Sequence, residues 1–154
     1  MSKKTVVWLF LALMVLVVSP VSAQTAQGEI LGISVGMSGA EALTRLQKIG
    51  RREKEERKQQ EVWALNNDPR FSHLIVAFTK DYTEVRYVTA KVRDGAQVRY
   101  QDVIDLTKAR QVGARDNNKY VWEVPASAGR PGNVIIARGT DPEFLTYFSI
   151  EKGN

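Results

Sequence analysis

Residues 74–78 read LIVAF, and 60 residues further along the chain residues 134–138 read VIIAR. The same shift aligns other residues in the same order, with one residue of slippage at the tryptophans. The aligned pairs include Val62-Trp63 with Val121-Trp122, Tyr87 with Tyr147 and Thr89 with Ser149. Ordered matches at a fixed spacing are typical of a duplicated supersecondary unit, although single apolar matches arise by chance in strands. We therefore expect two sub-repeats, at about 34–93 and 96–151.

Each sub-repeat has the pattern of a helix followed by three strands. Apolar residues recur at three-residue steps between Ala40 and Ile49 and stop at Gly50, which predicts an amphipathic helix. A shorter pattern of the same kind predicts a second helix at 103–109. Alternation of apolar and polar residues predicts strands at 61–65, 73–79, 84–93, 119–124, 133–138 and 144–151.

The remaining signals complete the predicted fold. Asp94-Gly95 predicts a hairpin, and with it a further strand near 96–100. The run RREKEERKQQ at 51–60 carries five positive and three negative residues, which is typical of a solvated helix or a long polar loop. The alternative for this run, a contact with an acidic partner, has little support because its net charge is too small to steer one.

The predicted fold class is thus α+β. We expect two tandem helix-plus-antiparallel-meander units that form one sheet, with the helices packed on one face of it.

The first 23 residues have the composition of a secretory signal peptide. Lys3 and Lys4 precede the apolar run TVVWLFLALMVLVV, and Val21-Ser22-Ala23 is a small-residue cleavage pattern. The apolar run is shorter than the ~20 residues that span a bilayer comfortably. We expect cleavage near Ala23/Gln24, leaving residues 24–154 as a single exported domain, soluble in the periplasm or secreted. The alternative is an uncleaved signal anchor, in which case this segment is the contact with the membrane.

Composition excludes several classes of function. The chain has no cysteine, so the exported domain has no disulfide and no thiol that could carry a lipid. The net charge of +5 includes Lys3 and Lys4, so loss of these two residues leaves +3. That charge, without a dense basic patch, gives no reason to expect nucleic-acid binding. One histidine and no cysteine exclude zinc and most transition-metal sites. The sequence also lacks the glycine-rich phosphate loop that would indicate a cofactor. We expect no metal and no cofactor.

Residues 36–40 read GMSGA, which is the pattern of a hydrolase nucleophile elbow around Ser38. Its base would have to be His73, the only histidine, with Asp68 as the acid. These two lie five residues apart in one segment, and predicted meanders do not supply the large parallel sheet of such hydrolases. The structural alternative is a capping box, in which Ser38 accepts from the Glu41 amide and the Glu41 carboxylate returns to the Ser38 amide. We expect Ser38 to cap the first helix, and we expect no catalytic residue.

The best candidate for a binding site is the sheet itself. Alternation places Tyr87 and Tyr147 on one face, which becomes polar towards the ends of their strands. Tyrosine suits a docking surface because it combines apolar area with a hydrogen-bonding tip. We expect these two residues to contact a protein or cell-envelope partner; the alternative is that they are half-buried at the margins of the sheet. Trp63 and Trp122 are expected in the core.

Four short motifs follow one another in the first sub-repeat. They are GMS at 36–38, a helix ending in L-x-x-x-G at 46–50, a tryptophan strand and V-x-F at 76–78. Together they resemble the small outer-membrane assembly lipoproteins of the SmpA/OmlA kind, and also the β-lactamase-inhibitor-protein fold, in which such a unit is duplicated. The chain departs from this pattern in two ways: it has no lipobox cysteine, and the second sub-repeat has no GMS start.

The resemblance implies an exported, non-enzymatic module that binds another protein, in the inhibitors through a concave sheet face. We therefore predict a non-enzymatic protein-binding or envelope-associated module. Two alternatives stay open: a carrier that holds a small apolar ligand between helices and sheet, and a serine hydrolase that uses Ser38.

Overall fold

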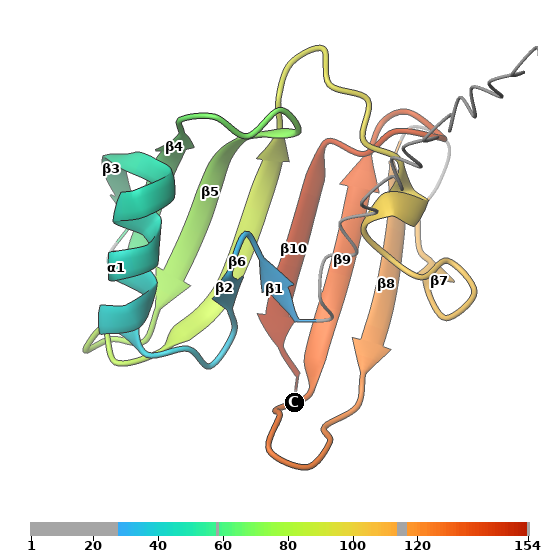
Figure 1. Cartoon of the computed structure of the whole chain (residues 1–154). Coiled ribbons are helices and arrows are strands. Elements are labelled where there is room, and N and C mark those ends of the chain that lie inside the picture. Colours follow the sequence, from blue (N-terminus) through green and yellow to red (C-terminus); the bar gives the residue numbers. More distant parts are fainter. Residues whose placement is uncertain (1–27, 58, 114–116, 154) are drawn as a thin grey trace, which may run out of the picture.

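The computed structural model describes residues 28–57, 59–113 and 117–153, which form mainly β structure (Figure 1). One eight-stranded sheet has the order β3-β4-β5-β6-β10-β9-β8-β7, and every neighbouring pair is antiparallel. Its strands are β3 (Gly50–Arg57), β4 (Gln60–Leu65), β5 (Phe71–Phe78), β6 (Val85–Val92), β7 (Arg110–Gln111), β8 (Asn118–Val124), β9 (Asn133–Gly139) and β10 (Tyr147–Lys152). The predicted signal segment, residues 1–23, lies outside the described residues.

Three smaller elements complete the fold. The strands β1 (Glu29–Ile30) and β2 (Ile33–Ser34) form a separate hairpin, α1 (Gly39–Ile49) follows it, and η1 (Tyr100–Asp102) is a single 3₁₀ turn. In the described ranges, neither helix has the length and apolar character needed to cross a membrane.

The sheet consists of two four-stranded halves that meet at β6 and β10. Across this junction Thr89 lies opposite Ser149, Lys91 lies opposite Tyr147, and Tyr87 lies opposite Glu151. The register is therefore symmetric about the Thr89–Ser149 pair. The strand order is symmetric about the same junction.

The core lies on one face of the sheet. In Figure 1, α1, the β1–β2 hairpin and η1 all lie in front of the strands. The fully buried side chains of this layer include Leu46 on α1, Ile30 and Ile33 on the hairpin, and Phe78 and Phe148 on the sheet. Each buried side chain of this size stabilises the fold by roughly 1.5–3 kcal/mol.

The prediction of an α+β fold with two helix-plus-meander units is wrong. Within the described residues there is one α-helix, and the fold is mostly β. The six strands predicted from alternation are confirmed, as β4, β5, β6, β8, β9 and β10. The error lies in the segments between them.

The second predicted helix, at 103–109, does not form. Asp105 accepts hydrogen bonds from the Thr107 amide at 3.0 Å and from the Thr107 hydroxyl at 2.6 Å. Such local side-chain bonds offer the backbone an alternative to the helix. The β-branched Val103 and Ile104 lower the helix propensity further. Both are nevertheless buried, so the segment packs on the core as turns.

The charged run also differs from its prediction. Residues 50–57 form β3, an edge strand paired with β4, and not a solvated helix or polar loop. Charged residues are common on edge strands because they discourage pairing with other chains. The run is extended because β4 supplies hydrogen bonds to its backbone. These bonds come from another segment, so the sequence of the run itself does not show the alternation of a strand.

The predicted strand near 96–100 is absent from the described residues. The turn at Asp94-Gly95 forms, with the Ala96 amide donating to the Arg93 carbonyl at 2.9 Å. A hairpin partner for β6 would need a free edge, and β5 and β10 occupy both edges of that strand. The segment therefore leaves the sheet, apart from one isolated bridge between Arg99 and Phe144.

Candidate functional site

The face of the sheet opposite α1 is open. Within the described ranges, no helix or strand packs on it (Figure 1). The residue pairing places its side chains in rows that cross the strands, because residues directly opposite in neighbouring strands point to the same face. Three such rows form the open face.

The central row contains small and apolar residues. Thr89 and Ser149 lie at its middle, with Ile75 and Ile136 on either side. Val62 and Val121 continue the row outward. Because Thr89 and Ser149 are small, the face is hollowed around them, with a volume of about 440 Å³.

A second row carries positive charge, and we call it the cationic row. It consists of Lys91 on β6, Tyr147 on β10, Arg138 on β9 and Lys119 on β8, each directly opposite the next. The Arg138 guanidinium lies over the Tyr147 ring, 5.0 Å from its centroid. This distance is within the range of a cation–π interaction, which keeps the guanidinium close to the ring.

The third row lies on the other side of the central one and is acidic. Glu151 pairs with Tyr87 on one side and with Val134 on the other, and Glu123 lies opposite Val134. The open face therefore changes from positive to negative across its apolar centre.

The two tyrosines predicted to bind a partner share the open face but do not touch. Tyr147 belongs to the cationic row and Tyr87 to the acidic row, on opposite sides of the Thr89–Ser149 pair. The strand rise and spacing put them about 14 Å apart. The Tyr87 hydroxyl donates to Gln60 at 2.5 Å, so both rings are held in place by neighbours.

Ser38 lies at the N-terminus of α1, where it caps the helix. Its hydroxyl accepts from the Glu41 amide at 3.3 Å, which confirms the predicted cap. The Glu41 carboxylate instead pairs with Arg45 at 2.6 Å. Ser38 forms a β-bridge with Glu84, which lies beyond the C-terminal end of β5. His73 lies near the N-terminal end of the same strand. About 17 Å of strand separates these two ends, so Ser38 and His73 are not brought together.

His73 has other neighbours on the open face. Its Nε2 lies 3.3 Å from the Glu53 carboxylate, and its Nδ1 lies 2.9 Å from the Ser72 hydroxyl. That hydroxyl also donates to the Lys91 carbonyl at 3.4 Å. The three side chains resemble a catalytic triad in their order of contact. Because the serine proton is engaged by the backbone, the contacts orient the imidazole at the sheet surface.

Asp81 and Asp141 lie in the turns that precede β6 and β10. Asp141 accepts from the amides of Glu143 and Phe144 at 2.7 and 2.9 Å. Hydrogen bonds from the Thr83 and Thr79 side chains hold the pKa of Asp81 below its usual value. Within the described residues, no group of three or more histidine, aspartate or glutamate side chains is placed to hold a metal ion.

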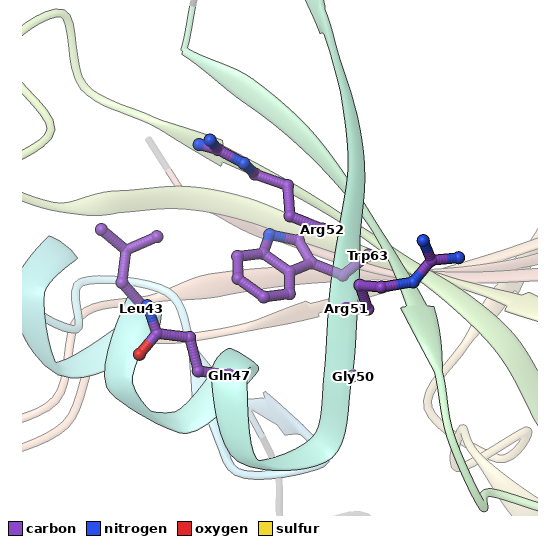
Figure 2. A pocket seen from close by; sticks show the side chains of 6 residues that line it. All are labelled: Leu43, Gln47, Gly50, Arg51, Arg52 and Trp63. Carbon is purple, nitrogen blue, oxygen red and sulfur yellow. The ribbon is translucent and has the colours of Figure 1, made fainter.

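A second hollow lies between α1 and the edge strands (Figure 2). Leu43 and Gln47 on α1 face Trp63 and Arg52 across it, and its volume is about 480 Å³. Trp63 is only 4 % exposed, as predicted for a core residue, whereas Trp122 is partly buried.

Two residues that line this hollow, Trp63 and Arg52, bind a buried carboxylate that was not predicted from the sequence. Glu61 is 2 % exposed and accepts from the Trp63 indole at 2.9 Å and from Arg52 at 3.0 Å. The alternation of the strand, which places Glu61 and Trp63 on one face, could have indicated this pairing.

The cationic row was also missed, because its residues come from four strands that are distant in sequence.

Comparison of the chain with protein-family models, with curated proteins and with solved structures gives no match.

Proposed function

We propose that this chain is an exported, non-enzymatic module that binds a protein partner on the open face of its sheet. The observation that carries the proposal is the uncovered face itself. It combines a hollow at the Thr89–Ser149 pair, which Ile75 and Ile136 flank, with charged rows of opposite sign. Apolar centres with polar margins are the usual anatomy of protein interfaces.

The order of the face supports the same conclusion. Thr89 and Ser149 are hydrogen-bonded, Tyr147 is covered by Arg138, and Tyr87 is bonded to Gln60. Side chains that are already fixed lose little conformational entropy when a partner binds. Tyrosine and arginine are also among the residues that contribute most at interfaces.

The test is site-specific photo-crosslinking in the cell envelope. A photoreactive phenylalanine analogue replaces Tyr147 in one variant and the exposed Lys48 of α1 in a control variant. We expect a discrete adduct from position 147 and none from position 48. The captured protein is then purified, and its affinity for the unmodified chain and for Tyr147→Ala is measured. Identical affinities would argue against the open face as the binding site.

A second candidate function is the carriage of a small apolar ligand in the hollow between Leu43 and Trp63 (Figure 2). One specific observation favours it, namely that an aromatic ring and an aliphatic side chain face each other there from different elements. Native mass spectrometry of the purified protein would show a bound molecule. Its loss in Leu43→Gln, with an unchanged fold, would locate the molecule in this hollow.

A further inference from the structure

Three positive side chains lie in one row on the open face. Lys91, Arg138 and Lys119 share the cationic row, with Tyr147 between the first two. Neighbouring strands are about 4.8 Å apart, so the row from Lys91 to Lys119 is about 14 Å long. Arg138 and Lys119 are direct cross-strand neighbours.

This arrangement is unfavourable in the isolated molecule. Like charges directly opposite each other destabilise a sheet. Among the described residues, Lys91, Arg138 and Lys119 form no ion pair that would offset the repulsion. An anionic partner would remove this repulsion on binding.

One carboxylate of the chain itself already lies beside this row. His73 lies directly opposite Lys91 and continues the row on β5. Its Nε2 is 3.3 Å from the carboxylate of Glu53. A carboxylate at the surface of the sheet can therefore lie beside the side-chain nitrogens of this row.

The neighbouring rows decide between classes of partner. The apolar central row lies about 7 Å to one side of the cationic row, and the acidic row with Glu151 and Glu123 lies as far again beyond it. A membrane surface or a nucleic-acid duplex is broad and anionic, so it would meet the acidic row as well. A polypeptide segment is narrow enough to cover only the cationic and central rows. Its apolar side chains would also contact Ile75 and Ile136, which a phosphodiester chain could not match.

We propose that the open face binds an acidic polypeptide segment, whose carboxylates lie along Lys91, Arg138 and Lys119 and whose apolar side chains lie on the central row. This inference rests on the proposed function, since it names the chemistry of the partner for the same face.

The test compares two triple variants that change charge equally. Lys91→Gln/Lys119→Gln/Arg138→Gln removes the cationic row. The control, Lys48→Gln/Lys80→Gln/Arg86→Gln, removes three exposed cations from other places. Binding of fluorescent poly-L-glutamate is measured by anisotropy, with the protein obtained by expressing the full chain. We expect about tenfold weaker binding for the row variant, as for three exposed ion pairs of modest strength. The control should change by less than about twofold, and salt should weaken the binding.

Two further probes test the class of partner, namely phosphatidylglycerol vesicles and a single-stranded DNA oligonucleotide. Tighter binding of either probe than of poly-L-glutamate, with the same dependence on the row, would overturn the polypeptide assignment. Equal loss of poly-L-glutamate binding in both triple variants would overturn the role of the row. If poly-L-glutamate does not bind while position 147 still gives a crosslinked partner, the inference fails and the proposed function stands. If position 147 gives no adduct either, the proposed function fails as well.

Discussion

Thr89 and Ser149 face each other across the junction of β6 and β10, with their hydroxyl oxygens 2.8 Å apart. Sixty residues separate them in the chain, and they are 8 % and 7 % exposed. The pair lies at the centre of symmetry of the sheet register and at the floor of the open face. Its hydrogen bond therefore joins the two halves of the molecule at the centre of the proposed binding surface.

Loss of one hydroxyl from this pair should destabilise the fold. Thr89→Val leaves the Ser149 hydroxyl without its partner, and we expect a loss of about 1 kcal/mol in the free energy of unfolding. The double variant Thr89→Val/Ser149→Ala should lose less than the sum of the two single variants, because the interaction can be lost only once. Urea denaturation of the four proteins measures this. Strict additivity would show that the two hydroxyls do not depend on each other.

Ser38→Ala should lower stability by about 1 kcal/mol, since it removes the acceptor that caps α1 at the Glu41 amide. Thr44→Ala is the control on the same helix. Its hydroxyl bonds back to the Ala40 carbonyl, and alanine is the better helix former, so no loss is expected. A fluorophosphonate probe should label the wild type and Ser38→Ala alike. Labelling that depends on Ser38 would support the hydrolase alternative instead.

Gly39→Ala should be more costly than an ordinary glycine substitution. A Cβ at this position would lie 1.8 Å from the Tyr82 carbonyl oxygen, so helix and turn must separate. We expect a loss of about 2–3 kcal/mol, typical of forcing atoms into a packed site. Gly129→Ala is the control, because its Cβ would meet nothing within 4 Å although its φ is +76°. If the two variants unfold at the same urea concentration, the close approach at Gly39 is not limiting.

Tyr100 gives the fold a dependence on alkaline pH. Its ring is buried and its hydroxyl donates to the Asp141 carbonyl at 3.1 Å. Burial, and secondarily the nearby Tyr120 and Asp141, raise the pKa of Tyr100 above its usual value of 10.0. Because the pKa of Tyr100 is higher in the folded state than in the unfolded state, its contribution to stability is complete below the pKa of the unfolded state. That contribution is lost as pH rises through the pKa of the folded state.

We therefore expect the stability advantage of the wild type over Tyr100→Phe to shrink as pH rises above 10.0. Near neutral pH the advantage should be about 1 kcal/mol, the value of one hydrogen bond. Urea denaturation of both proteins on either side of pH 10.0 provides the measurement, and the groups common to both proteins cancel in the difference. An advantage that does not change with pH would contradict the assignment.

The sequence by itself determined the elements whose pattern is local. Alternation predicted β4, β5, β6, β8, β9 and β10, since a half-buried strand shows its two faces in its own residues. The cap at Ser38 and the amphipathic face of α1 could be predicted for the same reason. Both depend on residues within one or two turns of each other.

Only the tertiary structure decided the rest. The charged run became β3 because β4 offers it hydrogen bonds, and residues 96–100 stayed outside the sheet because β10 occupies the edge of β6. The open face likewise exists only after folding. Lys91, Lys119 and Arg138 become neighbours through the pairing of four strands, and that pairing depends on backbone hydrogen bonds between segments far apart in the chain. Local patterns show which way a side chain points, whereas strand pairing decides which side chains it meets.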